Sequence, residues 1–300
     1  MKTITPSLDL VVDAGNYLGE TPVWSPDEQI LYWINCEQPP ELHSWNPATK
    51  AHRQWLMPKR IGGLAPTADG ALIVALSDGL YDFSPKDGAL RLRAPSPFGP
   101  RVALHETCVD HQGRLWVGGY DLDFTGASLN GPDLPRKGAL CRLDGDVLVR
   151  VYEGVTVSNG LAVSPDGRSL YHTDTLSGVL QRWSLDPDTG HLTTPHEFVR
   201  LPLQEGFMDG AAVDSEGGYW SVLAVAGKIH RYLPNGALDL VVDMPFNMPI
   251  KVAFGGETLD TMYLTTAALN GRAGSAKSAP IGGVFSFKPG FKGLPQPLVR

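Results

Sequence analysis

A repeated pattern of short alternating runs and tight turns is the feature that most limits what this chain can fold into. The clearest copy spans residues 157–190 and begins with Asn159-Gly160 and a short apolar run. A Ser-Pro-Asp-Gly turn follows at 164–167, and alternating runs come after it at 170–174 and 179–185. The proline favours the second position of a turn, and the glycine tolerates the positive φ at which a chain reverses. Strand, turn, strand, turn, strand is an antiparallel meander, the shape of one propeller blade.

Other segments repeat this unit, and a blade needs such neighbours because it buries its faces only against them. Aligning each segment on its turn and following strand gives six copies at roughly 40–55 residue spacing, the range expected for propeller blades. The first residues of the copies are Glu20, Gly62, His105, Asn159, Asp209 and Lys251. The sequence therefore predicts one all-β domain over residues 1–300, a six-bladed β-propeller of four-stranded antiparallel blades around a central channel. The weakly alternating segment Leu8–Asp13 is the candidate strand for closing the ring.

The shared first position of the copies predicts where side chains from distant parts of the chain meet. The innermost strand of each blade lines the channel, so one position at its start forms a ring. Glu20, Asp209 and Asn159 would bring two carboxylates and a carboxamide to this ring. Crowded carboxylates repel and are costly to desolvate unless a cation neutralises them. Oxygen ligands suit hard ions such as calcium, magnesium and manganese, so the ring predicts a divalent cation site.

The composition disfavours several classes of partner. Acidic and basic residues are interspersed at a net charge of −7, which argues against nucleic acid or an anionic membrane. No stretch approaches the roughly 20 apolar residues of a membrane span, and residues 1–15 lack an apolar signal core. The three cysteines, Cys36, Cys108 and Cys141, have no metal-type spacing. We expect a reduced cytoplasmic protein, monomeric or weakly homo-oligomeric, without nucleic-acid or membrane partners.

Several recurring residues have a structural interpretation. Asp110, Asp166 and Asp214 recur from copy to copy but fall in turns, so we interpret them as turn and strand-end residues. Four tryptophans lie on predicted strands and are expected in the core between blades: Trp33, Trp116, Trp183 and Trp220. Insertions at 121–137 and 267–280 are polar or rich in small residues. The first of them is either a lid beside the ring or a plain surface loop.

Motifs in five of the six copies carry a family likeness. They are Leu-Gly-Glu-Thr-Pro-Val-Trp at 18–24, Asp-x-x-Gly-Arg-Leu-Trp at 110–116, Ser-Asn-Gly-Leu-Ala-Val-Ser-Pro-Asp-Gly at 158–167, Tyr-His-Thr-Asp at 171–174, Met-Asp-Gly at 208–210 and Gly-Gly-Val-Phe at 282–285. Over nearly its whole length the chain resembles the SMP-30/gluconolactonase/luciferin-regenerating-like family, in particular its bacterial gluconolactonase and xylonolactonase-like members. The resemblance implies a six-bladed propeller of carbohydrate metabolism that hydrolyses a sugar lactone to the aldonic acid with one divalent metal ion.

The resemblance also implies roles for individual residues. The metal ligands of the family are a Glu, an Asn and an Asp, which match Glu20, Asn159 and Asp209, the three side chains already singled out by the ring. In the implied mechanism the metal polarises the lactone carbonyl and water attacks it. Asp209 is the candidate catalytic base, because a carboxylate bound to metal through one oxygen can accept a proton through the other.

The chain departs from the family pattern where the substrate is expected to bind. Relatives usually carry Arg-x-Asn-Asp-Gly before the strand of the third copy, whereas this chain has Ala-Leu-His-Glu-Thr at 103–107. The candidate substrate-binding residues are Arg101, His105, Glu106 and Lys251. His105 is alternatively a structural histidine or a fourth metal ligand, which would shift the metal preference from calcium toward iron, zinc or manganese. Lys251 either contacts the lactone or pairs with ring carboxylates.

Two other functions stay open at this point. The altered pair His105 and Glu106 leaves room for another metal-dependent esterase or a phosphotriesterase on the same site. A metal-binding propeller without catalysis is the second alternative. Intact ring carboxylates argue against the second, because a pure scaffold has no need of them, and lactone hydrolysis is the favoured expectation.

Overall fold

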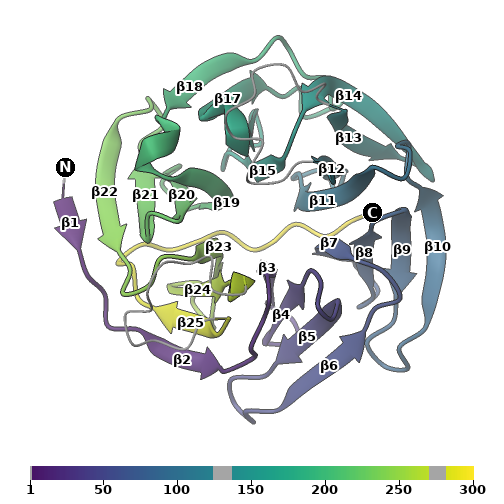
Figure 1. Cartoon of the computed structure of the whole chain (residues 1–300), viewed down its shortest axis with the longest axis horizontal. Coiled ribbons are helices and arrows are strands. Elements are labelled where there is room, and N and C mark those ends of the chain that lie inside the picture. The colour runs from purple at the N-terminus through teal and green to yellow at the C-terminus, as the bar shows by residue number, and fades with distance from the viewer. Residues whose placement is uncertain (1, 124–136, 270–281) are drawn as a thin grey trace.

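Six antiparallel sheets arranged in a closed ring make up the molecule (Figure 1). The structure is a computed structural model that describes residues 2–123, 137–269 and 282–300. Residues 124–136 and 270–281 are not described, so most of the predicted insertions at 121–137 and 267–280 lies outside the described residues. The predicted all-β six-bladed propeller with four-stranded blades is confirmed.

Each blade is a meander whose strands follow one another from the channel outward. Blade one consists of β3 (Gly19–Ser25), β4 (Ile30–Asn35), β5 (Glu41–Trp45) and β6 (His52–Leu56). Blade two consists of β7 (Ile61–Pro66), β8 (Leu72–Leu76), β9 (Gly79–Phe83) and β10 (Leu90–Pro95). Blade three consists of β11 (Val102–Val109), β12 (Leu115–Asp121), β13 (Gly138–Asp144) and β14 (Val147–Val155).

The second half of the chain continues this pattern. Blade four consists of β15 (Ser158–Val163), β16 (Ser169–Asp174), β17 (Val179–Ser184) and β18 (His196–Arg200). Blade five consists of β19 (Phe207–Val213), β20 (Tyr219–Ala224), β21 (Lys228–Tyr232) and β22 (Leu238–Asp243). Blade six consists of β23 (Pro249–Gly255), β24 (Thr261–Thr266) and β25 (Val284–Phe287). Two short 3₁₀ turns, η2 (Thr175–Ser177) and η3 (Leu203–Glu205), connect strands in the second half.

The N-terminal segment closes the ring. Strand β2 (Asp9–Val12) pairs antiparallel with β25 and becomes the outer strand of blade six, which confirms the predicted closing strand. Strand β1 (Lys2–Ile4) pairs parallel with β22 and adds a fifth strand to blade five, which the sequence did not predict. The innermost strands β3, β7, β11, β15, β19 and β23 each pack against the next, and β23 packs against β3. Blades three and six therefore lie on opposite sides of the channel.

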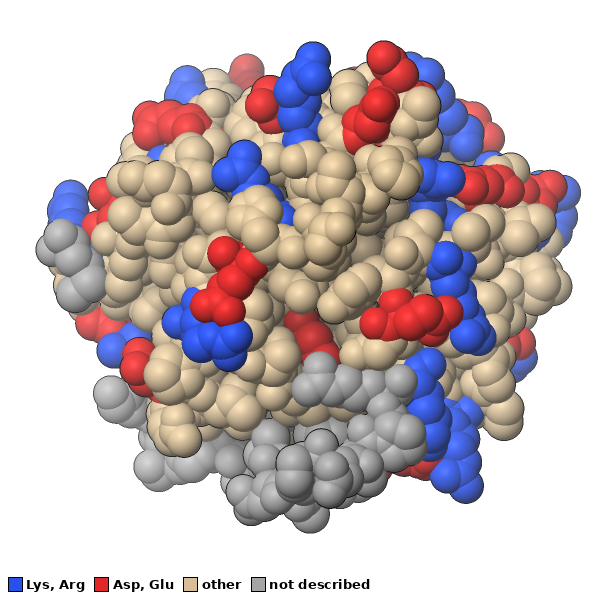
Figure 2. Space-filling model, turned by 90° about the horizontal axis from the view of Figure 1, so that it is seen from above, with Lys and Arg blue, Asp and Glu red and all other residues tan. Residues whose placement is uncertain are grey.

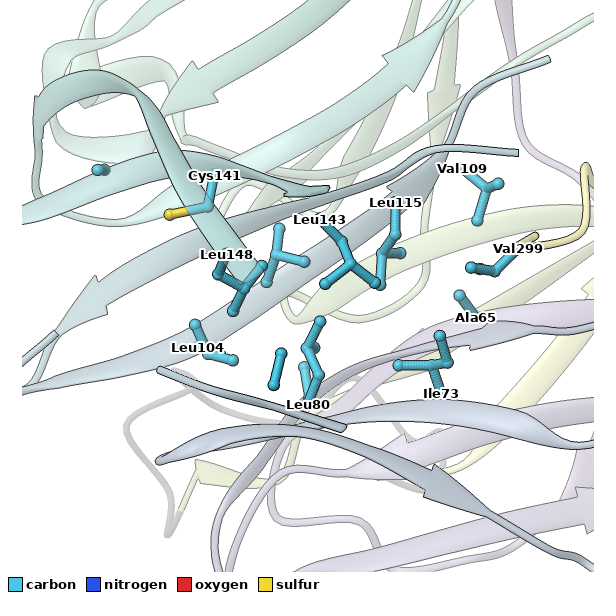
Figure 3. Packing of buried hydrophobic residues seen from close by; sticks show 14 residues of the cluster. Ala65, Ile73, Leu80, Leu104, Val109, Leu115, Cys141, Leu143, Leu148 and Val299 are labelled. Carbon is cyan, nitrogen blue, oxygen red and sulfur yellow. The ribbon is translucent and has the colours of Figure 1, made fainter. Parts of the chain in front are cut away.

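The core lies between neighbouring blades rather than in one central layer. Between blades two and three, Ile73 and Leu80 pack with Leu104, Leu115 and other apolar side chains (Figure 3). The inner strands are buried along most of their length because both faces of each sheet are covered. The four tryptophans expected between blades are all buried, which confirms that prediction.

The C-terminal segment crosses one end of the channel (Figure 1). It lies at the end where the inner strands finish, opposite the end where the ring of first residues lies. The carbonyl of Lys292 accepts from the backbone of Ser215 in blade five, and Gly293 donates to Leu259 in blade six. Val299 donates to Pro66 at the end of β7, and its side chain packs between blades two and three (Figure 3). This segment therefore ties four blades together, since Arg300 also donates to a blade-three turn.

The recurring turn aspartates brace their blades, which confirms their structural interpretation. Asp110 accepts hydrogen bonds from the Nε1 of Trp116 at 3.1 Å and from the side chain of Arg114. Asp214 accepts from the Nε1 of Trp220 at 2.8 Å and from the Nε of Arg231 at 2.7 Å. Each of these carboxylates therefore joins a turn to the tryptophan of the strand that follows it.

Charged side chains of both signs are interspersed on the side of the ring shown in Figure 2. Among the described residues, no helix is long and apolar enough to pass through a membrane.

Candidate functional site

The first strand of every blade carries a β-bulge close to the position where the sequence copies begin. The slips in pairing fall between Glu20 and Val23, Ile61 and Gly63, His105 and Thr107, Asn159 and Ala162, Met208 and Ala211, and Pro249 and Lys251. A bulge leaves residues unpaired and re-aims neighbouring side chains. Six bulges at one level of the ring therefore direct side chains away from the regular alternation and into the channel.

Two carboxyl groups from separate blades meet at this level. Glu20 is on β3 and Asp209 is on β19, and their carboxyl groups lie within hydrogen-bond reach of each other. Burial raises the pKa of Glu20 to about 7, and the charge of Glu106 adds to this shift. Burial and the charges of Glu20 and Glu106 raise the pKa of Asp209 well above its ordinary value. Two carboxyl groups placed in this way either share a proton or neutralise their charge on a cation.

The amide of Asn159 is held in one orientation by a short chain of hydrogen bonds. Thr175 donates its hydroxyl proton to the carbonyl of Met208 at 2.9 Å, so its oxygen can only accept a further bond. Asn159 supplies that bond from its Nδ2 at 2.8 Å. The Oδ1 of Asn159 consequently points elsewhere, and it is buried without a hydrogen-bond partner. A buried carbonyl oxygen without a donor fits a ligand that the site is built to hold.

A buried ion pair crosses the channel from blade three to blade six. The Nζ of Lys251 donates to the Oε2 of Glu106 at 2.6 Å, and the two residues are 145 positions apart. The Oε1 of Glu106 accepts from the backbone N–H of Leu161 at 3.1 Å. Burial alone would lower the pKa of Lys251, but the charges of Glu106 and Glu20 outweigh it and raise that pKa. Of the two roles predicted for Lys251, pairing with a carboxylate is therefore the one observed.

The bulge of blade six lies before Lys251, whereas the bulge of blade four lies after Asn159. Phe254 pairs with Met262 in blade six as Val163 pairs with Leu170 in blade four. Cross-strand pairing keeps Lys251 at the ring position, since it pairs with Thr265 as Asn159 pairs with Thr173, whereas counting back along the inner strand from Phe254 gives Ile250. By the same count along the inner strand, Lys251 corresponds to Glu106 of blade three, one residue after His105.

His105 and two further side chains form one corner of the site. His105 is buried, and its Nδ1 has no hydrogen-bond partner. Burial lowers the pKa of His105 well below its usual value, with Arg60 and Lys251 adding to the shift, so the imidazole is neutral. The ring of Tyr120 lies 5.6 Å from the ring of His105, centroid to centroid. The guanidinium of Arg60 lies 4.8 Å from the centroid of the same tyrosine ring.

Arg101 is placed away from this group. Its side chain is 70% exposed and its Nη1 donates to Asp123 at 2.7 Å. Asp123 also pairs with Lys137, so the arginine belongs to a surface ion-pair cluster. Among the sequence candidates, the structure therefore gathers Glu20, His105, Glu106, Asn159, Asp209 and Lys251 and leaves out Arg101.

Two residues at the site were missed by the sequence reasoning. Thr175, which orients Asn159, directly follows the Tyr-His-Thr-Asp motif and carries no signal of its own. Arg60 lies two residues before Gly62, where a Cβ would come within 2.1 Å of the carbonyl oxygen of Leu104. Blade two therefore contributes no side chain to the ring at Gly62. The nearest large polar residue before this glycine is Arg60, which is the signal that could have pointed to it.

A cavity of about 120 Å³ lies further along the channel and does not include the ring residues. It is lined by later residues of the inner strands, among them Thr107, Lys251 and Val252, and by residues 294–297 of the C-terminal segment. The ion pair between Glu106 and Lys251 lies between this cavity and the ring.

The fold and site define a six-bladed β-propeller that gathers carboxylates and an orphaned amide oxygen at one level of its channel. Residues 18–268 match the model of the SMP-30/gluconolactonase/LRE-like region. The chain belongs to this family, as its motifs indicated.

Individual relatives cover nearly the same length. The chain is 35% identical to the 6-deoxy-6-sulfogluconolactonase of Pseudomonas putida, over 97% of this chain and 98% of that protein. It is 33% identical to a pentonolactonase of Haloferax volcanii, over 87% of this chain and 85% of the relative. A solved structure of a calcium-binding protein, regucalcin from Agrobacterium tumefaciens, superposes with a TM-score of 0.89 at 23% identity, over 100% of this chain and 99% of the other, and supports the fold.

Proposed function

We propose that this protein is a sugar lactonase that hydrolyses an aldonolactone to its aldonic acid with the help of one divalent metal ion. The observation that carries the proposal is the group formed by Glu20, Asp209 and the unpartnered Oδ1 of Asn159. The names of the two relatives support the substrate class, since each is a lactonase of a sugar acid.

The residues present fit a cation. Glu20 and Asp209 have raised pKa values because burial and mutual repulsion disfavour two negative charges, and a cation removes that cost. Within the described residues, no three His, Cys, Asp or Glu side chains gather closely enough to hold a metal by themselves. The amide oxygen of Asn159 therefore supplies the third ligand, and an all-oxygen set suits calcium, magnesium or manganese. His105, which lies within hydrogen-bond reach of Asn159, is the alternative nitrogen ligand.

The metal, when bound, would supply a Lewis acid for the lactone carbonyl. Asp209 would hold the metal together with Glu20 and Asn159, and its carboxylate would accept the proton of the attacking water. Asn159 keeps its amide oxygen aimed at the site because Thr175 fixes its orientation. Glu106 and Lys251 close the channel beneath the ring, and His105 offers its Nδ1 to a substrate hydroxyl.

The proposal is tested by acid release from a panel of five- and six-carbon sugar lactones, before and after removal of metal by a chelator. We expect hydrolysis to be lost when metal is removed and restored when a divalent ion is returned. Asp209→Asn is expected to lower the rate by about 100-fold or more, whereas Asp188→Asn in an exposed turn leaves it unchanged. Full activity after verified metal removal would contradict the proposal.

The same panel separates the alternatives. Hydrolysis of aryl esters or phosphotriesters without turnover of any lactone would indicate another hydrolase on this site. Tight metal binding without turnover of any of these substrates would indicate a non-catalytic propeller.

A further inference from the structure

Arg60 carries hydrogen-bond donors that the protein leaves unused. Its Nε and Nη1 are buried, and neither has a hydrogen-bond partner. None of the ion pairs among the described residues includes this guanidinium. Buried donors are nearly always partnered in folded proteins, and a charged donor left unpaired is costly. A residue of this kind is kept where a ligand completes its hydrogen bonds.

The surroundings hold the guanidinium in place. Arg60 immediately precedes β7 and lies two residues before Gly62, at the gap that blade two leaves in the ring. The ring of Tyr120 on β12 supports the guanidinium through a cation–π contact at 4.8 Å. Beside Tyr120, the buried His105 has its own unpartnered nitrogen. Three nitrogens without partners, two of Arg60 and one of His105, therefore lie in one corner formed by blades two and three.

This corner adjoins the proposed metal ligands, since His105 lies within hydrogen-bond reach of Asn159. The charge of Arg60 acts on both Glu20 and His105, so the guanidinium lies within electrostatic reach of each. Neither Glu20 nor any other described carboxylate comes within ion-pair distance of Arg60. A substrate held at the ring by its lactone carbonyl would thus extend its other end toward Arg60.

We propose that Arg60, supported by Tyr120 and flanked by His105, binds an anionic group on the sugar lactone at the end remote from the reacting carbonyl. A planar guanidinium fork matches two oxygens of a carboxylate, sulfonate or phosphate and forms charge-assisted hydrogen bonds with them. A neutral hydroxymethyl group offers one weak acceptor and would leave one buried donor unpaired. This inference rests on the proposed function and names its substrate class, an aldonolactone with a second, anionic substituent.

The test compares matched lactones. Six-carbon δ-lactones with a carboxylate, sulfonate or phosphate at C6 are compared with the same lactone carrying a C6 hydroxyl, in wild type, Arg60→Gln and Arg60→Lys. We expect Arg60→Gln to lower kcat/KM for the preferred anionic lactone about 10- to 100-fold, the worth of a hydrogen bond to a charged group. The neutral lactone should change less than about threefold, and Arg60→Lys should recover only part of the loss. The control is Arg91→Gln, which removes an exposed guanidinium on β10.

A binding measurement separates this inference from the proposed function. The aldonic acid with the same C6 anion is titrated calorimetrically into chelator-treated protein, which requires neither metal nor turnover. Arg60-dependent binding of the C6 anion supports the subsite even if wild type hydrolyses no lactone, in which case only the proposed function fails. Equal losses for neutral and anionic lactones, or binding that ignores Arg60, would overturn the inference.

Stability of the ligand-free protein gives a second check. Because the Nε and Nη1 of Arg60 have no partners, Arg60→Met should unfold at the same or a higher denaturant concentration than wild type. A marked loss of stability would assign Arg60 a structural role and count against the subsite.

Discussion

Asn159 illustrates how a single hydrogen bond at the residue scale prepares a ligand. Its amide group would otherwise be free to present either nitrogen or oxygen to the channel. Thr175 removes that freedom because its hydroxyl donates its proton to the carbonyl of Met208. The nitrogen of Asn159 must then face Thr175, and the oxygen faces the site.

Removing the hydroxyl of Thr175 tests this orientation. In Thr175→Val the amide of Asn159 loses its acceptor and is free to turn, so we expect divalent-metal affinity to fall about 10- to 100-fold, as for other residues that orient metal ligands. Calorimetric titration of the metal measures the change, and the exposed Thr193→Val serves as control. Unchanged affinity in Thr175→Val would show that another contact fixes the amide.

The pH dependence of stability can be assigned to a buried histidine in blade one. His43 stacks on Trp33 with ring centroids 4.9 Å apart, and burial, with a smaller effect of His52, lowers its pKa to about 3. The unfolded chain takes up this proton near pH 6.5, whereas the folded protein resists it until about pH 3. The contribution of His43 to the free energy of unfolding is therefore fully present above pH 6.5. Between pH 6.5 and about 3 it falls by about 1.4 kcal/mol per pH unit.

Replacing His43 should therefore flatten the pH profile. Urea unfolding of His43→Gln between pH 6.5 and 4.5 is expected to show a shallower loss of unfolding free energy than wild type, by about 1 kcal/mol per unit. The exposed His196→Gln should retain the wild-type slope. Parallel profiles for all three proteins would contradict the assignment.

At the element scale, a hydrogen bond from a turn aspartate to the tryptophan of the following strand stabilises blades three and five. Asp214 holds both Trp220 and Arg231, and Arg231 is only 2% exposed. Asp214→Ala leaves this buried guanidinium without its innermost partner, so we expect a loss of about 3–5 kcal/mol in the free energy of unfolding. Asp166→Ala in the corresponding exposed turn of blade four should cost less than about 1 kcal/mol. Equal losses of unfolding free energy for Asp214→Ala and Asp166→Ala, measured by denaturant unfolding, would show that Asp214 has no special structural role.

Turns and alternation made the blades predictable from sequence. The copies at Glu20, Asn159 and Asp209 share the turn spacing that sets their strand register. The expected meeting of Glu20 with Asp209 across two blades is observed. Lys251 pairs with Thr265 as Asn159 pairs with Thr173, in line with the alignment, but the bulge of blade six falls on the other side of this residue, which hydrophobic alternation does not reveal. Thr175 and Arg60 depend on contacts between separate segments, and no local pattern marks such contacts. The metal, the substrate and the catalytic base stay predictions.

At the scale of the whole molecule, ion pairing across the channel links opposite blades. Glu106 and Lys251 are both buried and bonded to each other at 2.6 Å. Lys251→Met should cost about 3–5 kcal/mol of unfolding free energy because it leaves a buried carboxylate unpaired. The double variant Glu106→Gln with Lys251→Met should recover more than half of that loss, since no charge is left behind. Additive losses in a double-mutant cycle would indicate that the two side chains act independently.

Closure of the ring is what brings Glu20 of blade one to the side chains of blades four and five. The N-terminal strands β1 and β2 complete blades five and six, and the C-terminal segment ties four blades at the opposite end of the channel. The proposed cation site therefore depends on the whole ring and not on any one blade.

The most direct test is an anomalous-scattering map from a crystal of this protein grown with manganese. We expect one peak in the channel, at about 2.0–2.6 Å from a carboxylate oxygen of Glu20, from Oδ1 of Asn159 and from a carboxylate oxygen of Asp209. A map without a peak at the ring, or with a peak that Asn159 does not contact through Oδ1, would contradict this expectation.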